Sequence, residues 1–478
     1  MLKWLVFLPV AGALLTGLWP GARTRWWLAL ASALAALAAC GCLAVAYDLQ
    51  GPLFQFEESR AWNARLGSYF ALGVDGVAVA MLLLTAVLTL VAVLMSRPMA
   101  EAGRLYYTLL LLLESAIFGV FAARDWSLFY VFWEATLVPL FFLIDRLGGE
   151  DRQRAALNFF LYTLGGSVFM LVALLFLYDA APGHSFAMAD MAAGGQALAP
   201  RMQLLIFVGL FIGFGVKMPV FPLHGWLPLA HVEAPGPVSI LLSGILLKMG
   251  AYGLIRSAQT LPAGWLAAQD ALLALGLISL LYGGILAWRQ QGLKAMVAYS
   301  SISHMGLVLL GLASPDPRGL AGAVLQMVAH GLSAGLLFLL VGLLYQRCHR
   351  RDLADYASLC GVAPRFAFFV AFGLLAALGL PGSAGFIAEV HVLLALVARS
   401  GGGAVLLGIV LLIAAAASLR VLQRLCLPGP AMTLSDLSRS ETLAAGLLAA
   451  GLVGFGLWPQ PLLALIDGSL RLLVETGR

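Results

Sequence analysis

The chain has 478 residues, of which 62% are hydrophobic and only 11% are charged, and its mean hydropathy is +0.96. A soluble domain has about half apolar and about a quarter charged residues, so this composition excludes a water-soluble fold. The formal net charge of +5 forms no basic cluster suited to nucleic acid. We therefore expect the positive charge to face anionic lipid head groups.

Apolar runs long enough to cross a bilayer recur from Leu2 almost to the C-terminus. One helical span needs roughly 20 apolar residues, and the sequence predicts about fourteen spans in an all-α integral membrane fold. The first seven lie at residues 2–19, 26–47, 69–96, 105–122, 126–145, 155–179 and 202–230. The others lie at residues 237–257, 266–288, 293–313, 319–346, 364–398, 402–426 and 440–466. Residues 1–478 are thus predicted to form a single membrane domain.

The ends of the spans predict how the chain is oriented. Lys3 precedes the first apolar run, but no cleavage site of small residues follows it, so we expect a retained span rather than a removed signal. Lys and Arg are more frequent on the loops after odd-numbered spans. Short basic loops stay in the cytoplasm, so both termini are predicted on the non-cytoplasmic side.

The seventh and twelfth spans are too long for one straight helix. Their middles contain helix breakers, which are Pro219, Pro222 and Gly225 in one span and Pro381, Gly382 and Gly385 in the other. Proline removes a backbone donor and clashes with the preceding turn. Both spans are therefore predicted to be discontinuous, whereas the polar stretches at 48–68, 180–201 and 347–364 are predicted to be loops.

The cysteines give no sign of a structural or metal framework. They are scattered and lack the paired two-residue spacing of zinc and redox motifs, and they are Cys40, Cys42, Cys348, Cys360 and Cys426. We therefore expect neither a disulfide framework nor an iron–sulfur or other metal site.

Ionisable residues inside the predicted spans are the candidates for function. A charge at the bilayer centre costs roughly 2.5 to 3.5 kcal/mol on insertion scales, so each of these residues needs a reason to be there. They are Asp75, Glu114, Glu134, Lys217, Lys248, His304, His330 and Glu389.

The two lysines are the most informative of these residues. Arg is far commoner than Lys in this chain, yet the two basic residues in the middle of predicted spans, Lys217 and Lys248, are both lysine. A buried ammonium can lose its proton, whereas a guanidinium stays charged, so the choice of lysine favours a proton carrier. A static ion pair or snorkelling to the interface is the alternative. Glu134 is the expected partner of Lys217.

Two polar stripes predict a path for protons. Ser300, Ser301 and His304 cluster within one turn, and Gln326, His330 and Ser333 recur at helical spacing. Such stripes can hold a water wire, although a lone membrane histidine often makes only an interhelical hydrogen bond.

The remaining polar residues are less specific. Glu389 follows the second predicted break, where freed backbone groups must face protein or water, and is predicted to be an exit site. Glu114 faces either the path or a neighbouring subunit, and Asp75 is expected to cap its helix. His231 and Glu233 are separated from His224 by Pro228, so a structural or proton-uptake role is favoured over a metal site.

Long motifs recur in order along the chain. VKMPVFPLHGWLP occupies residues 216–228, around the first predicted break. The others are LGVDG at 72–76, FWE at 132–134, ILLK at 245–248, AYSSISHMG at 298–306 and QMVAHG at 326–331. Together they resemble the antiporter-like, proton-conducting membrane subunits of respiratory complex I, and the resemblance covers nearly the whole chain.

Within that superfamily the L-type, N-type and cation-antiporter subunits usually carry lysine in the twelfth helix, whereas the M type, or chain 4, carries glutamate. This chain has Glu389 there and stops at Arg478 without the long lateral helix of the L type. Both features indicate the M type.

The resemblance also implies an architecture and a set of site residues. It implies two inverted five-helix repeats, helices 4–8 at residues 105–257 and helices 9–13 at residues 266–426. A repeat of this kind is common in ion-coupled transporters. The essential pair then falls on Glu134 and Lys217, the central relay on Lys248, His304 and His330, and the terminal site on Glu389, with Glu114 as a further candidate.

The implied function is proton translocation as one subunit of an NADH–quinone oxidoreductase in the bacterial cytoplasmic (inner) membrane. The chain itself is expected to hold no cofactor, while partner subunits hold FMN, iron–sulfur clusters and quinone. Its expected partners are the other membrane-arm subunits, including the L-type and N-type chains, and the lipid bilayer. The alternatives are a subunit of a multi-chain sodium–proton antiporter, an energy-converting hydrogenase-like complex, and an unrelated permease.

Overall fold

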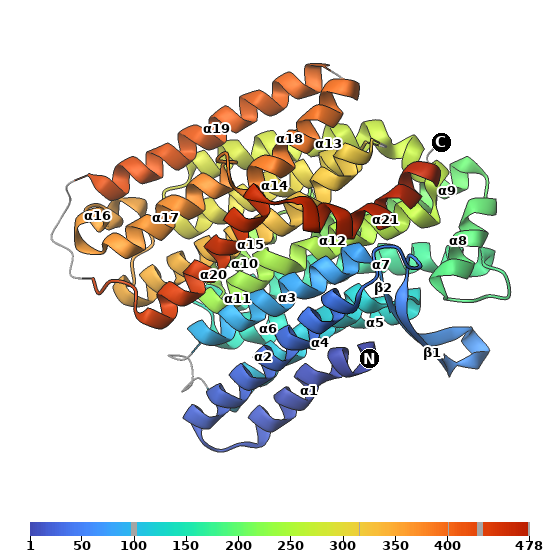
Figure 1. Cartoon of the computed structure of the whole chain (residues 1–478), viewed down its shortest axis with the longest axis horizontal. Helices are drawn as coiled ribbons and strands as arrows, with labels where there is room; N and C mark the ends of the chain where they lie inside the picture. Colours follow the sequence, from blue (N-terminus) through green and yellow to red (C-terminus); the bar gives the residue numbers. More distant parts are fainter. Residues whose placement is uncertain (97–102, 315, 400, 428–433, 477–478) are drawn as a thin grey trace.

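The computed structural model is a bundle of long helices that run side by side, with α1 and α2 at one end and α19 at the opposite end (Figure 1). It describes residues 1–96, 103–314, 316–399, 401–427 and 434–476. In this part of the chain, 12 helices are long and apolar enough to cross a membrane, and two shorter apolar helices accompany them. The predicted all-α membrane class is therefore confirmed.

The N-terminal part of the chain contributes α1 to α9 and a β-hairpin. Their bounds are α1 Leu2–Leu18, α2 Ala22–Ala46, β1 Gln55–Asn63, β2 Ser68–Val74, α3 Gly76–Met95, α4 Arg104–Ala122, α5 Trp126–Ala135, α6 Leu137–Leu147, α7 Arg152–Ala180, α8 Met188–Ala197 and α9 Pro200–Lys217. The stretch expected to be a loop at 180–201 therefore contains a short helix, α8.

The remainder of the chain contributes α10 to α21 and one π-helical segment. Their bounds are α10 Leu227–Glu233, α11 Gly236–Leu241, the π segment Leu242–Leu246, α12 Leu247–Thr260, α13 Pro262–Arg289, α14 Leu293–Leu312, α15 Pro317–Cys348, α16 Leu359–Val362, α17 Pro364–Ala377, α18 Ala384–Arg399, α19 Gly401–Cys426, α20 Arg439–Leu457 and α21 Gln460–Thr476.

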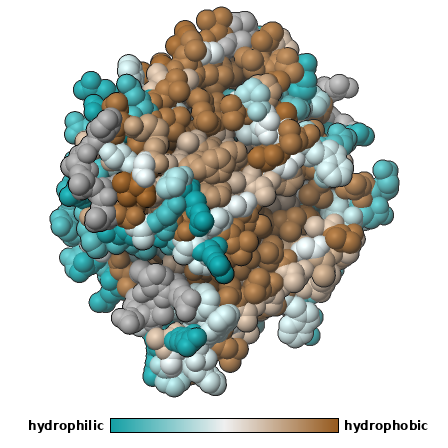
Figure 2. Space-filling view, turned by 60° about the vertical axis from the view of Figure 1, so that its left-hand side comes forward, coloured by the Kyte–Doolittle hydropathy of each residue, from teal (hydrophilic) through white to brown (hydrophobic). Residues whose placement is uncertain are grey.

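The core of the bundle is formed by helices that have no exposed side. The apolar windows of α15 and of the stretch Gly236–Thr260 are completely buried, whereas at most 39% of each apolar window of α7, α13 and α19 is buried. The outer surface carries broad apolar areas (Figure 2), as expected where lipid tails replace water. The candidate residues Lys248 and His330 lie on the two buried elements.

Both predicted discontinuous helices are confirmed. The seventh span stops at Lys217 and resumes at Leu227 after a run of turns, and the twelfth stops at Ala377 and resumes at Ala384. In each case the proline lies inside the break, where its missing N–H costs no helical hydrogen bond.

The start of the third span and the preceding loop were predicted wrongly. Strands β1 and β2 pair antiparallel across this region, so Tyr69 to Val74 are extended rather than helical. The apolar run YFALGV reads as a span by hydropathy, but its β-branched and aromatic residues also suit a strand. Asp75 then caps α3 by accepting a hydrogen bond from the backbone N–H of Ala78 at 2.9 Å, as predicted.

The last predicted span, 440–466, is wrong at its C-terminal end. Helix α20 stops at Leu457, and α21 starts at Gln460 and packs against α15 and α3. Pro459 and Pro461 lie at this boundary, and proline at the start of a helix separates it from the preceding one.

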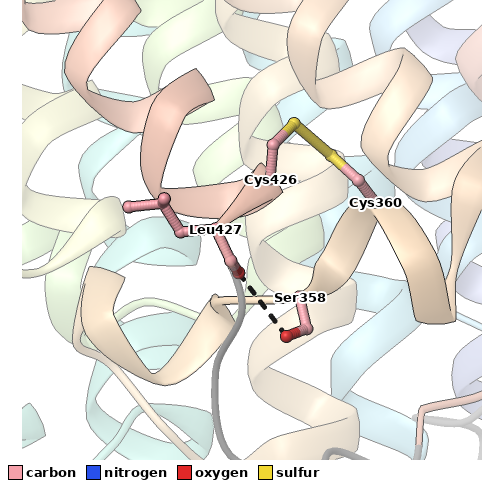
Figure 3. The surroundings of a disulfide bond; sticks show 4 residues. All are labelled: Ser358, Cys360, Cys426 and Leu427. Carbon is pink, nitrogen blue, oxygen red and sulfur yellow. Dashed lines mark hydrogen bonds between the residues drawn. A yellow bond between two sulfur atoms is a disulfide. The ribbon is translucent and has the colours of Figure 1, made fainter.

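A disulfide joins Cys360 of α16 to Cys426 at the end of α19 (Figure 3). The two residues are 66 positions apart in sequence, and their Cα atoms are 5.2 Å apart. The backbone N–H of Ser358 donates to the carbonyl of Leu427 at 2.8 Å, so a hydrogen bond closes the same junction. The expectation of no disulfide is therefore wrong, because tertiary packing pairs cysteines whose sequence spacing shows nothing.

Candidate proton-relay site

Three of the predicted relay residues form a chain of contacts at the centre of the bundle. The Nζ atom of Lys248 lies 2.6 Å from Nδ1 of His330. The imidazole rings of His330 and His304 follow, with centroids 5.1 Å apart. Lys248 lies on α12, His330 on α15 and His304 on α14, so these three helices place the side chains together.

The π-helical segment before α12 positions Lys248. The carbonyl oxygen of Ser243 accepts a hydrogen bond from Lys248 Nζ at 2.6 Å. The hydroxyls of Ser243 and Ser301 lie 3.0 Å apart and link this segment to α14. A π turn interrupts the regular hydrogen-bond ladder of a helix and recurs at functional sites. Here the carbonyl within the π segment faces the lysine that follows it.

His304 connects the chain of contacts to the second helix break. Its Nε2 atom lies 2.9 Å from the carbonyl oxygen of Ala377. Ala377 is the last residue of α17, and a carbonyl at this position has no donor within its own helix. His304, Ser300 and Ser303 also line a cavity of about 50 Å³ next to Ala377. A water occupies about 30 Å³ in the liquid, so this cavity has room for a water molecule next to the imidazole.

Glu389 lies beyond that break on α18 and is 6% exposed. Its carboxylate packs against Gly379, where an added Cβ would collide with it, and Gly379 has a φ of 76°. The turn between α17 and α18 therefore favours glycine for its backbone conformation, and a side chain at this position would displace the carboxylate of Glu389.

The expected Glu134–Lys217 pair is close but does not form an ion pair. Lys217 Nζ donates to the Thr136 hydroxyl at 2.9 Å and lies 4.9 Å from the ring centroid of Trp133. Glu134 Oε1 is buried without a hydrogen-bond partner in the described part of the chain. Thr136 is thus a contact of Lys217 that we did not predict from the sequence. Its position two residues after Glu134 is the sequence signal that could have indicated it.

A known protein family, described as "NADH:quinone oxidoreductase/Mrp antiporter, TM", matches residues 123–414, more than half of the chain. The chain belongs to this family. The antiporter-family chain is similar to "NAD(P)H-quinone oxidoreductase chain 4 2" of Thermosynechococcus vestitus, with 43% identity over 82% of this chain and 74% of that protein. It is also 39% identical to a "chain 4 1" protein of Synechococcus sp. (strain JA-3-3Ab), over 95% of this chain and 89% of that protein. The resemblance to chain 4 is confirmed.

Solved structures agree with this assignment. The antiporter-family chain superimposes with a TM-score of 0.91 and 31% identity on a chain of "Respiratory complex I from Thermus thermophilus with bound NADH", covering 100% of this chain and 99% of that one. A chain of the Mrp complex from Dietzia sp. DQ12-45-1b has a TM-score of 0.87 over 99% of this chain and 98% of that one, at 20% identity. The second match shows a shared fold.

The antiporter-family chain also contains a buried ion pair that the sequence did not predict. Arg256 of α12 donates to Asp75 through both terminal nitrogens, at 2.8 and 2.7 Å, and its side chain is 3% exposed. The hydroxyl of Tyr252 accepts a third bond from Arg256 at 2.7 Å. Two turns separate Arg256 from Lys248 on the same helix, so the pair anchors the helix that carries Lys248.

Glu114 is not brought into contact with the other residues predicted to form the relay. It is fully buried on α4, and neither carboxylate oxygen has a hydrogen-bond partner among the described residues. The adjacent Ser115 donates to the carbonyl of Val6 at 2.7 Å, so this part of α4 packs against α1.

Residues 231–233 end α10, and the imidazole of His231 stacks on the ring of Phe338, two turns after His330 on α15, with the ring centroids 4.4 Å apart. Glu233 pairs with Arg351 at 3.0 Å. Lys294 Nζ donates to the carbonyls of Val232 and Ala234 and lines a cavity of about 200 Å³ with Arg351. Within the described residues no three His, Cys, Asp or Glu side chains form a group that could hold a metal ion.

Proposed function

We propose that the chain is the proton-translocating, chain 4-type membrane subunit of an NADH–quinone oxidoreductase. The family assignment, the names of the two cyanobacterial relatives and the match along the whole length of a Thermus complex I chain support this function. The enzyme activity belongs to the assembled complex, in which other subunits reduce quinone. FMN and iron–sulfur clusters belong to those subunits, and the L-type and N-type chains are the neighbours in the membrane.

The contact chain of Lys248, His330 and His304 is the observation that carries the proposal. A neutral imidazole accepts a proton on one nitrogen and donates from the other, so it can pass a proton between the lysine and the second histidine. The cavity beside His304 and the freed carbonyl of Ala377 extend this line of polar groups into the second break. Glu389 is the terminal site beyond it.

The first part of the path comprises Glu134 and Lys217. A change at Glu134, driven by the neighbouring subunit, alters the proton affinity of Lys217 and passes a proton towards Lys248 and the histidines. Residues 105–257 and 266–426 are the two inverted repeats of this path, and both termini face away from the cytoplasm of a bacterial cell. Glu114 acts at the contact with another chain or in packing.

Substitution of the central lysine tests the proposed function. Membrane vesicles that contain the complex with Lys248→Met should keep NADH–quinone electron transfer partly active but lose most of the NADH-driven acidification, measured with a ΔpH-sensitive dye. The matched control is Lys3→Met, since the Lys3 side chain is 53% exposed. Undiminished acidification by Lys248→Met would refute the relay, and acidification that depends on sodium would favour an antiporter instead.

A further inference from the structure

The side-chain nitrogen of Lys217 contacts neutral groups rather than the carboxylate of Glu134. Thr136 accepts its hydrogen bond at 2.9 Å, and the face of Trp133 lies 4.9 Å away. Among the described residues Lys217 forms no ion pair with Glu134 at the usual 4.0 Å limit. Trp133 and Glu134 are adjacent in α5, and Thr136 directly follows that helix. A movement of the long, flexible lysine side chain would exchange one partner for the other.

The local backbone fixes the polarity of the Thr136 hydroxyl. Thr136 lies between the end of α5 and the start of α6 and is fully buried. Its hydroxyl donates its only proton to the carbonyl of Trp133 at 2.7 Å. A hydroxyl has one proton to donate, so the bond to Lys217 can only be one in which the lysine nitrogen donates.

This polarity makes Thr136 a partner for both protonation states of the lysine. A neutral amine and an ammonium can each donate to a neutral oxygen. A carboxylate, in contrast, strongly favours the charged form of a lysine beside it. The lysine can therefore release its proton while it is held by Thr136, and it keeps the proton when it reaches Glu134.

We propose that Thr136 is a positioning residue that holds Lys217 away from Glu134, and that movement of the lysine between these two partners sets when the proton is released. This inference rests on the proposed function, since it assigns a role to Thr136 in the same relay. The buried Oε1 of Glu134, which lacks a hydrogen-bond partner in the described part of the chain, is the acceptor that the lysine would reach.

The test compares three threonine variants in membrane vesicles that contain the whole complex. In Thr136→Val the neutral acceptor is lost, and the carboxylate of Glu134 is the polar partner that remains for Lys217 among the residues that the structure describes. NADH-driven acidification, measured between pH 6 and 9 and divided by the electron-transfer rate, should fall severalfold. Its alkaline midpoint should rise by about one pH unit, which is a tenfold increase in proton affinity. Thr136→Ser, which keeps the hydroxyl, should restore the original profile.

The matched control is Thr163→Val on α7. Thr163 is also buried, at 3% exposure, and its hydroxyl also donates to a backbone carbonyl, that of Phe159 at 2.7 Å. This variant should leave the pH profile unchanged, because a loss of packing does not alter the proton affinity of Lys217. If Thr136→Val fails to assemble, Thr136→Ala serves for the same measurement.

Each outcome is decisive when Lys217→Ala is measured in parallel. Normal acidification by Lys217→Ala would refute the proposed relay itself. If Lys217→Ala abolishes acidification but Thr136→Val and Thr163→Val share one unshifted pH profile, only the role of Thr136 is refuted. A midpoint that moves to lower pH in Thr136→Val would also overturn the inference.

Discussion

The buried pair of Asp75 and Arg256 should show strong thermodynamic coupling. Arg256→Met leaves the Asp75 carboxylate buried without its countercharge, and breaking a buried pair from one side costs about 3 to 5 kcal/mol. Asp75→Asn combined with Arg256→Met removes both charges. It also keeps a capping oxygen for Ala78, since Asn caps a helix as well as Asp does. The double variant should therefore recover most of the stability that the single variant loses.

Thermal unfolding of the purified membrane protein, in detergent at one fixed pH, checks this order. The exposed pair of Asp316 and Arg318 is the control, because its side chains are 20% and 51% exposed and a surface pair contributes only about 0 to 1 kcal/mol. Arg318→Met should thus hardly change the unfolding temperature. If the losses from Asp75→Asn and Arg256→Met simply added in the double variant, the reasoning about an uncompensated buried charge would be refuted.

Three further changes have definite expected results. Gly379→Ala should reduce vesicle acidification and destabilise the fold by at least about 1 kcal/mol, since a side chain at positive φ is strained and would displace the carboxylate of Glu389. Cys360→Ser removes the disulfide that closes a 66-residue loop and should lower the free energy of unfolding by up to about 4 kcal/mol in the chain-entropy view. A reducing agent should have no effect on the thermal midpoint of this variant. Asp436 is partly buried, which raises its pKa, but backbone N–H groups, including those at the start of α17, donate to its carboxylate and lower the pKa below its ordinary value overall. The stabilisation by this carboxylate should be present above about pH 4 and disappear on acidification. A thermal-unfolding series over pH should show that Asp436→Asn abolishes this pH dependence.

The sequence predicted the parts of the fold that depend on hydropathy and on helix breakers. Apolar runs identified the membrane helices, and prolines identified the interruptions after Lys217 and Ala377. Hydropathy could not separate strand β2 from α3, because a short apolar run suits both structures. It also could not show where α20 gives way to α21, since a Pro-marked corner between two apolar helices has the same mean hydropathy as one long helix.

The contacts of the candidate site were less predictable than its residues. The cost of burying charge singled out Lys248, His304 and His330, and the structure brings these three together. Arg256 was missed because a basic residue near the end of an apolar run looks like a loop-facing side chain. The hydrogen bond from Lys217 to Thr136 was missed because threonine is common in membrane helices, where its hydroxyl usually donates to a backbone carbonyl of the same helix.

Helix α15 has 32 residues, and its apolar window is completely enclosed by protein. At a rise of 1.5 Å per residue it measures about 48 Å, longer than the hydrocarbon layer of roughly 30 Å. A helix in contact with lipid would tilt to accommodate this mismatch, but α15 has only protein neighbours to determine its angle. Bilayers of different thickness should therefore act on the peripheral helices α7, α13 and α19, while the spacing around His330 stays constant from one lipid composition to another.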